Sequence, residues 1–260
     1  QGKISLTTTM MNDALCFAIK DNGPGISKAD QAHIFNKFSR VIMRENVAVV
    51  DLFYLPPIEF FVATAEMDTL WIEAHDNYQK QSYRNRTALQ MANKVEFLSI
   101  PVVGGNKKIK YREVVMDDRQ RWRDIHLRGM KSAYGKAPFF EYFYPEIERL
   151  FQENIPHLYA FNYHLLTLCL KLLDRSVKIE ETLEYQVHED KTDLRGVINA
   201  KAPYGERNIF EPYPYLQLFG LNFAPNLSII DLLFCEGPNS KIVIDRSKKE
   251  KEHYLKGLRF

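Results

Sequence analysis

Short apolar runs separated by turn residues predict strands and a helix from Val47 onward. Val47–Leu52 and Thr69–Ala74 are apolar runs of strand length, and Leu98–Val103 is a third. Between the first two, Ile58–Ala65 directly follows Pro57, a residue suited to the first turn of a helix. Because a strand, a helix and a strand follow one another, this part of the chain predicts a βαβ unit and a parallel sheet.

Longer periodic segments predict helices in the second half of the chain. Trp122–Tyr134 has amphipathic helical spacing, and Ile147–Asp174 has the pattern of a helical hairpin. The aromatic cluster Phe139–Tyr144 is expected to belong to the core. Tyr213–Phe219 and Asn226–Phe234 predict a buried helix pair. The expected fold class is therefore α/β, with a mostly parallel central sheet and C-terminal helices packed on it.

The first forty residues follow a different pattern. Lys3–Lys20 alternates and is rich in Thr, Ile and Phe, which predicts a β-hairpin. A glycine-containing run, DNGPGI, comes next and precedes a predicted helix through Phe38. Glycines let the backbone approach a ligand closely, and Asp21 has a carboxylate that accepts a hydrogen bond from a ring amino group.

DNGPGI followed by IFNKFSR resembles the ATP-binding domain of sensor histidine kinases. The resemblance implies that Asp21, Gly23 and Gly25 contact a nucleotide. The upstream asparagine-bearing helix and the downstream second glycine box of that family have no counterpart here. We therefore expect an incomplete α+β ATPase fragment with a vestigial site, cut upstream of Gln1, which would need a partner chain to bind ATP. A fragment of a sensor histidine kinase is accordingly one interpretation of the chain.

The change of pattern divides the chain into three expected parts. Residues 1–43 form the truncated histidine-kinase-like fragment, 44–245 the main domain and 246–260 a basic C-terminal tail. Met43 is a candidate for an old start codon, so the junction has the appearance of a gene fusion. A solvated helix accounts for the lysines of the tail more simply than a binding surface does.

Composition and charge exclude several classes of protein. The chain has 260 residues, 45% hydrophobic and 26% charged, and a net charge of +2 with both signs interspersed. That balance argues against nucleic-acid binding, which favours a basic face. The three cysteines, Cys16, Cys169 and Cys235, form no CxxC pair, which indicates neither a metal site nor a disulfide framework. Reduced thiols of this kind are typical of a cytosolic compartment, so we expect a cytoplasmic protein. No run reaches the roughly 18 apolar residues of a membrane span, so we expect no membrane insertion.

The most polar stretch, His75–Thr87, directly follows a predicted buried strand. Ligands of parallel sheets bind where strands end, which would gather Tyr54, Pro56 and Glu59 with His75 and Asp76 at one mouth. Within the stretch, Arg84 and Arg86 are two residues apart, so an extended chain would point both guanidinium groups to one side, toward a phosphate or carboxylate. A solvated loop or short helix is the alternative interpretation.

Two further polar residues stand in apolar surroundings. His126 lies on the predicted helix Trp122–Tyr134, where a structural role and a catalytic-base role are both open. Asp231 interrupts an apolar run and needs a partner, for which nearby cations or a ligand amine are the candidates.

Several separated motifs together resemble the WbqC family over about residues 47–244. They are LPPIEFF, HDNYQKQSYRNR, LSIPVV, the helix ending in SAY with APFFEYF, and APNLSIIDLLFCEGPNS. The resemblance implies a bacterial protein of surface polysaccharide (O-antigen) biosynthesis that transfers a small group to a sugar. It carries over a set of polar positions: Tyr54, Lys80, Arg84, Asn85, Arg86, His126, Tyr134 and Asp231.

The first functional hypothesis is a transferase acting on an activated or phosphate-bearing sugar precursor, such as a nucleotide sugar. In it Lys80, His126 and Asp231 are the catalytic candidates: Lys80 neutralises developing charge and His126 is the general base. Arg84 and Arg86 bind the anion, and Tyr54, Asn85 and Tyr134 complete substrate binding. No cofactor is expected.

The second hypothesis is a non-catalytic accessory or binding protein of the same pathway, in which the polar stretch docks a partner protein. It is favoured because no nucleophile elbow, metal triad or phosphate-cradling glycine loop is present in the sequence.

Overall fold

The computed structural model describes residues 4–11, 14–21, 45–105, 108–188, 191–220 and 222–249. The chain divides into two compact units, Gln1–Arg44 and Glu45–Phe260.

The first unit contains an antiparallel hairpin of two strands, β1 (Ile4–Met11) and β2 (Ala14–Asp21). Met11 pairs with Ala14 at the turn and Ile4 pairs with Asp21 at the open end, so the predicted hairpin is confirmed. Asp21 is the last residue of β2, while Gly23 and Gly25 lie outside the described residues. The kinase-like identity of this unit stays a prediction.

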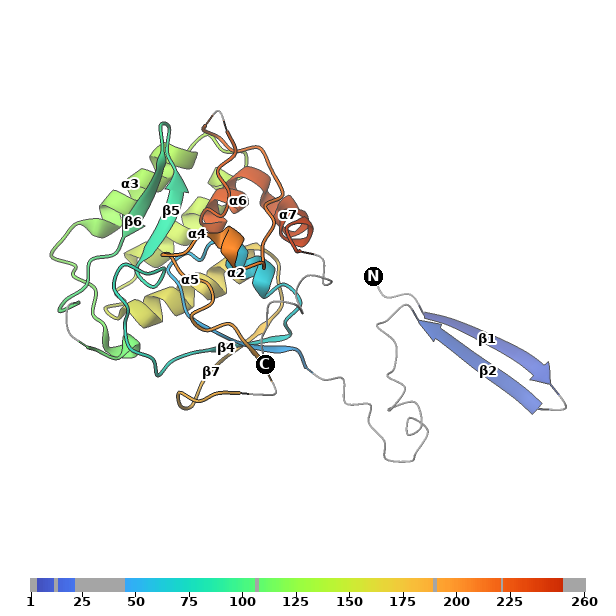
Figure 1. The fold of residues 1–260 in the computed structure, drawn as a ribbon. Coiled ribbons are helices and arrows are strands. Elements are labelled where there is room, and N and C mark those ends of the chain that lie inside the picture. The colour runs from blue at the N-terminus through green and yellow to red at the C-terminus, as the bar shows by residue number, and fades with distance from the viewer. Residues whose placement is uncertain are drawn as a thin grey trace. The chain divides into compact units, whose positions relative to one another are not determined.

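A four-stranded parallel sheet organises the second unit (Figure 1). Its strands are β3 (Val47–Val50), β4 (Thr69–Ile72), β7 (Lys178–Glu181) and β8 (Thr192–Asp193), in the spatial order β7-β4-β3-β8. Every pair runs parallel. Between β3 and β4 lies α2 (Ile58–Ala63), so the predicted βαβ unit and mostly parallel sheet are confirmed.

A separate hairpin carries the strands β5 (Arg86–Gln90) and β6 (Val95–Ser99). The prediction of a buried strand over Leu98–Val103 is therefore wrong in position and partner. β6 pairs antiparallel with β5, and only Leu98 of its five residues is buried. Pro101 has no N–H to donate, so the ladder cannot continue through it.

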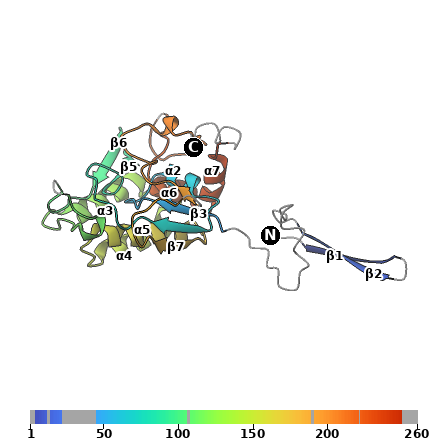
Figure 2. The same cartoon turned by 60° about the horizontal axis from the view of Figure 1, so that its bottom comes forward.

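The helices supply most of the core. They are α3 (Trp122–Tyr134), α4 (Phe140–Gln152), α5 (Leu158–Leu172), α6 (Ile229–Glu236) and α7 (Ser240–Arg246). Short 3₁₀ helices occupy Tyr111–Glu113, Tyr204–Glu206 and Gly237–Asn239. Figures 1 and 2 show α4 beside α5, and α3 beside the β5–β6 hairpin.

The apolar helix α6 lies at the centre of this packing. It contacts α2, α4, α5 and α7, and all of its residues up to Cys235 are buried, which fits a helix that is apolar except for Asp231 and Glu236. The second member of the predicted helix pair does not exist, because residues 213–219 follow an irregular path. Pro212 and Pro214 explain the difference, since each restricts the preceding residue to extended backbone.

No helix in the described part of the chain is long and apolar enough to cross a membrane.

Candidate functional site

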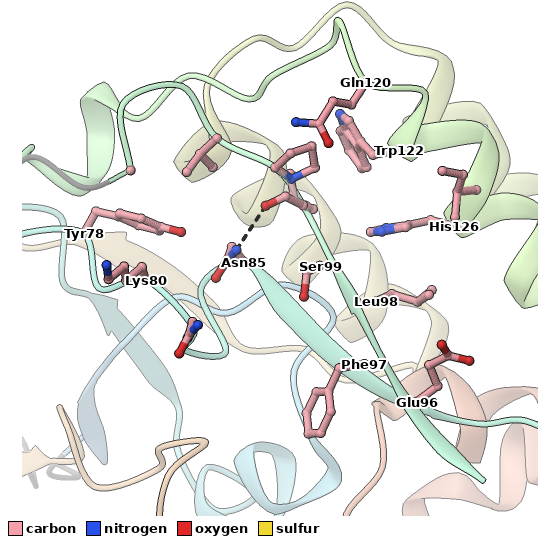
Figure 3. Close-up of a pocket in the computed structure, with 16 residues that line it drawn as sticks. Tyr78, Lys80, Asn85, Glu96, Phe97, Leu98, Ser99, Gln120, Trp122 and His126 are labelled. Carbon is pink, nitrogen blue, oxygen red and sulfur yellow. Dashed lines mark hydrogen bonds between the residues drawn. The ribbon is translucent and has the colours of Figure 1, made fainter.

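A polar pocket of about 640 Å³ lies between the β5–β6 hairpin, the loop after β4 and the start of α3. We call it the hairpin pocket, and Figure 3 shows its lining. Its lining includes Tyr78, Lys80, Asn85, Phe97, Ser99, Gln120, Trp122 and His126. Three of the sequence-predicted site residues, Lys80, Asn85 and His126, therefore meet at one cavity.

Helix α3 presents two of the pocket's rings. Trp122 and His126 are four residues apart and thus share one face of the helix. Their ring centroids are 5.3 Å apart in an edge-to-face arrangement. The Trp122 indole N–H donates to the Asp118 carboxylate at 2.9 Å, which fixes the ring. In Figure 3 the His126 ring is directed from α3 toward Ser99, with Lys80 on the opposite side of the pocket.

Tyr54 lies behind His126 rather than in the pocket. Its hydroxyl is 2.8 Å from the His126 Nδ1, and both side chains are buried. Burial raises the pKa of Tyr54 well above its ordinary value, so the hydroxyl keeps its proton. Among the described residues that proton bonds to the His126 Nδ1, which favours the imidazole tautomer that accepts at Nδ1 and carries its proton on Nε2.

The charge state of His126 follows from its burial. Burial lowers the pKa of His126 to about 4, against a smaller opposing effect of the Ser99 backbone. The imidazole is therefore neutral at pH 7. In the favoured tautomer its Nε2–H is a donor engaged by the Ser99 backbone, and a donor cannot take a proton. The predicted general-base role therefore has no support from this geometry.

Asn85 and Arg86 leave polar atoms unsatisfied beside the pocket. The Asn85 side-chain amide donates to the Ile100 carbonyl at 3.0 Å (Figure 3), while its Oδ1 is buried without a partner among the described residues. The Arg86 Nε is likewise buried and unpartnered, and its guanidinium lies 5.7 Å from the centre of the Phe97 ring. Buried polar groups are normally satisfied, so these two are available to a ligand or water.

Arg84 does not point to the same side as Arg86. The chain turns at Ser82–Asn85, where the Asn85 N–H donates to the Ser82 carbonyl at 3.2 Å, so the expectation of an extended chain is wrong. The Arg84 side chain is 4% exposed and pairs with Asp51 at 2.9 Å and Asp76 at 2.5 Å. Because two carboxylates already pair with the Arg84 guanidinium, its main role is to hold these segments together through ion pairs.

Tyr134 and Asp231 lie away from the hairpin pocket. Asp231 is fully buried and accepts hydrogen bonds from the Tyr215 hydroxyl and, at 3.2 Å, from the Gln217 amide. Its predicted cation or ligand amine is thus replaced by a phenol and an amide. Burial raises the pKa of Asp231, against the opposing effect of the hydrogen bond from Tyr215. The Tyr134 hydroxyl accepts from the Gln90 N–H at 3.1 Å.

The predicted mouth is also only partly assembled. Asp76 lies in the loop that follows β4, and the His75 Nε2 bonds the Thr182 carbonyl at 2.9 Å. Glu59, in contrast, is buried in α2 and forms a two-pronged ion pair with Arg207 at 2.7 and 2.6 Å. Glu59 therefore holds the chain around Arg207 in place.

Sequence reasoning missed Phe97, Gln120 and Asp51 as site residues. Phe97 stands 48% exposed on β6, and an aromatic residue on a polar hairpin strand was the available signal. Asp51 directly follows β3, so the rule that ligands bind at strand ends pointed to it. Gln120 offers no local signal, because only the fold brings it to the pocket.

The described residues contain no cluster of three or more His, Cys, Asp or Glu side chains able to hold a metal ion. What the hairpin pocket offers instead is flat aromatic surface next to amide, imidazole and ammonium groups. Such a lining suits a polar organic ligand of moderate size.

The fold and the pocket define an α/β protein with a polar ligand pocket beside a parallel sheet. Comparison with known proteins narrows this class: residues 53–209 match the WbqC-like protein family, and the chain belongs to that family. It is also similar to the uncharacterized protein Rv1507c of Mycobacterium tuberculosis, with 24% identity over 220 residues, 74% of this chain and 94% of that protein. No solved structure matches the chain.

Proposed function

We propose that the protein is a transferase that binds an activated or phosphate-bearing sugar precursor, with the sugar in the hairpin pocket, in bacterial surface polysaccharide (O-antigen) biosynthesis. Membership in the WbqC-like family supports the pathway, because the resemblance to that family implies a role in surface polysaccharide biosynthesis. The observation that carries the proposal is the pocket lining, in which Phe97 and Trp122 supply ring surface and Asn85, Gln120 and His126 supply polar groups. Sugars present C–H faces and hydroxyl groups side by side, so a sugar site needs aromatic ring surface and polar groups together.

Each polar group has a proposed task. The buried Asn85 Oδ1 accepts from a sugar hydroxyl, and the neutral His126 ring forms part of the pocket wall. Lys80, exposed at the rim, neutralises charge that develops on the transferred or leaving group. Tyr54 positions His126 from behind. Arg84 contributes through the ion pairs that order the loop carrying Lys80.

A thermal-shift panel of nucleotide sugars on the full chain tests the binding part of the proposal. A ligand at a hundred times its Kd stabilises by about 2.7 kcal/mol, and each kcal/mol raises the Tm by about 2–4 °C at this size. We expect one sugar class to produce such a shift. Gln120→Ala should reduce the shift, whereas Gln152→Ala, a matched change of an exposed glutamine at the end of α4, should not.

Transfer itself is tested by incubating the ligand found in this way with candidate acceptor sugars and following product by mass spectrometry. Lys80→Ala should lower kcat while leaving the Tm of the free protein unchanged, because Lys80 is exposed. A flat panel on a folded protein would reject the proposal.

The alternative, a non-catalytic accessory protein of the same pathway, is favoured by one specific observation. His126 and Arg84, two residues expected to act on substrate, are engaged by buried partners of the protein itself. That function predicts sugar binding without turnover, or a stable complex with a partner protein. Purification of the tagged chain followed by sizing, with and without Lys80→Glu, separates it from the transferase.

A further inference from the structure

Asn85 is a buried lining residue of the hairpin pocket, and the protein holds its side chain in place. The residue is 9% exposed. Its backbone N–H donates to the Ser82 carbonyl at 3.2 Å, and its backbone carbonyl accepts from the Ile100 N–H at 2.7 Å. The side chain adds a bond in the other direction, because Nδ2 donates to the Ile100 carbonyl at 3.0 Å (Figure 3). Asn85 and Ile100 are thus joined by a reciprocal pair of hydrogen bonds.

This pair also determines which way the Asn85 amide faces. The nitrogen of an asparagine amide donates hydrogen bonds and the oxygen accepts them. If the amide were turned over, Oδ1 would face the Ile100 carbonyl, so two acceptors would oppose each other and the 3.0 Å bond would be lost. The nitrogen therefore faces Ile100 and the oxygen faces away from it. Oδ1 is buried, and none of the described residues donates to it. Asn85 is consequently a fixed acceptor.

The N–H groups of the neighbouring lining residues already have acceptors. Three side chains donate within the protein: His126 to the Ser99 backbone, the Trp122 indole to Asp118 at 2.9 Å, and the Gln120 amide to Asp117 at 3.3 Å. The Tyr78 hydroxyl can donate or accept, so it suits either kind of ligand group. Among the described lining residues, the buried polar atom left without a partner is the Asn85 Oδ1. The pocket therefore requires a donor from its ligand at one fixed point.

A ligand that fills the hairpin pocket excludes solvent from the Asn85 Oδ1. A hydroxyl or amino group of the ligand supplies an O–H or N–H and satisfies the oxygen. A hydrogen atom at that position leaves the buried acceptor unsatisfied, and a carbonyl, ether or phosphate oxygen also repels it. A site built to bond a substrate hydroxyl or amine rejects the analogue that lacks it much more strongly than an apolar pocket rejects a missing methylene group.

The surface beside this acceptor is apolar and suits a ring. Phe97 on β6 is 48% exposed and Ile125 on α3 is 54% exposed, and both line the cavity together with Trp122. Exposed apolar side chains that gather at a cavity are typical of a binding surface. The ligand that matches this lining is a ring with an apolar face and a hydrogen-bond donor on its edge.

We propose that Asn85 is the specificity-determining residue of the hairpin pocket. It admits a ring that carries a free hydroxyl or amino group at the Oδ1 position and rejects the same ring when that substituent cannot donate. This assignment deepens the proposed function and rests on it only for the ring being a sugar. The phosphate of an activated precursor offers acceptors, so it lies away from Asn85.

Cyclohexanol and cyclohexanone test the requirement, because the two rings are alike in size and only the alcohol donates. The chain has two tryptophans, of which Trp122 lines the pocket and Trp71 on β4 does not. In ¹H–¹⁵N spectra of the full chain, Trp71→Phe identifies the Trp122 indole peak. Titration with cyclohexanol should shift the Trp122 peak and not the Trp71 peak, with the millimolar Kd expected of so small a ligand. The Kd of cyclohexanone should be about tenfold higher.

A pair of variants assigns this preference to Asn85. Asn85→Leu keeps the size of the side chain and removes the acceptor, so it should bind the alcohol and the ketone equally. Asn239→Leu is the matched control, since it changes an exposed asparagine of the 3₁₀ helix Gly237–Asn239 and should keep the tenfold preference. Circular dichroism melting establishes that each variant is folded. If Asn85→Leu does not fold, the comparison of the two probes on the wild type still decides the question.

Three results would overturn the assignment. They are a Trp122 peak that neither probe shifts at tens of millimolar, cyclohexanone binding as tightly as cyclohexanol to the wild type, and an unchanged preference in Asn85→Leu. If the preference is found and no nucleotide sugar raises the Tm, the proposed function fails and the donor requirement stands for another alcohol or amine. If a nucleotide sugar binds and the two probes bind equally, the reverse holds.

Discussion

Replacement of His126 by Gln tests whether the buried imidazole is neutral, the property on which its role in the pocket depends. In the folded protein burial lowers the pKa of His126 to about 4, whereas the ordinary value is 6.5. The unfolded chain therefore binds a proton between those two values and the folded chain does not. The stability contributed by the neutral imidazole is fully present above pH 6.5 and is lost as the pH falls through this window.

The size of the effect follows from the same two values. Between pH 7.5 and pH 5, protonation of His126 in the unfolded chain lowers the free energy of unfolding of the wild type by about 2 kcal/mol. His126→Gln lacks this loss. At pH 7.5 the variant is less stable than the wild type, because it gives up the ring contact with Trp122 and disturbs the Tyr54 hydroxyl, together about 2 kcal/mol. The deficit should therefore nearly vanish at pH 5.

Urea unfolding followed by tryptophan fluorescence at pH 7.5, 6 and 5 measures this difference. His164→Gln is the control, since it removes an exposed imidazole on α5 and should leave the pH dependence as in the wild type. If wild type and His126→Gln lose equal stability between pH 7.5 and pH 5, the imidazole is not held neutral by burial and the reasoning fails.

Three further predictions concern stability. Arg84→Ala leaves two carboxylates without their cation and should lower the free energy of unfolding by about 3 kcal/mol in urea; unchanged stability would show that the ion cluster is not formed. Asp231→Asn should become more stable relative to the wild type as the pH rises from 4 to 7. The pKa of the buried carboxyl is raised, so the wild type loses stability above pH 3.8 and the variant does not. An equal difference in the free energy of unfolding at both pH values would contradict this. Gly237→Ala should cost about 2 kcal/mol or more, since its φ is +53° and a Cβ would lie 2.5 Å from the Phe139 ring; Gly205→Ala, in open space, is the matched control in thermal melting.

The amino-acid sequence determined the elements whose signals are local. The apolar runs around Val49 and Leu70 predicted paired parallel strands, and the structure pairs them through β3 and β4. Helix α3 begins at Trp122 and ends at Tyr134, as its spacing predicted. The mostly apolar run of α6 predicted burial. These signals are readable because each depends on residues within one or two turns of the chain.

Prediction from the local pattern failed in two segments, one that contains two prolines and one that forms a hairpin. Residues 213–219 have apolar content that favours a helix, but Pro212 and Pro214 hold the backbone extended. The strand expected at Leu98–Val103 instead begins at Val95 and joins a hairpin outside the sheet. Hydrophobicity alone indicates that a segment is buried, but it does not indicate which segment packs against it.

Tertiary structure alone decided the chemistry of the polar residues. Arg84 was recognisable as an anion binder from its type, yet its anion is Asp51, 33 positions earlier, and a partner that distant leaves no mark in a local pattern. Tyr54 and His126, 72 positions apart, share a hydrogen bond that sets the tautomer of the imidazole and hence what it can donate. The sequence supplies the kinds of groups, while their pairing, burial and pKa depend on which distant segments the fold brings within hydrogen-bonding distance.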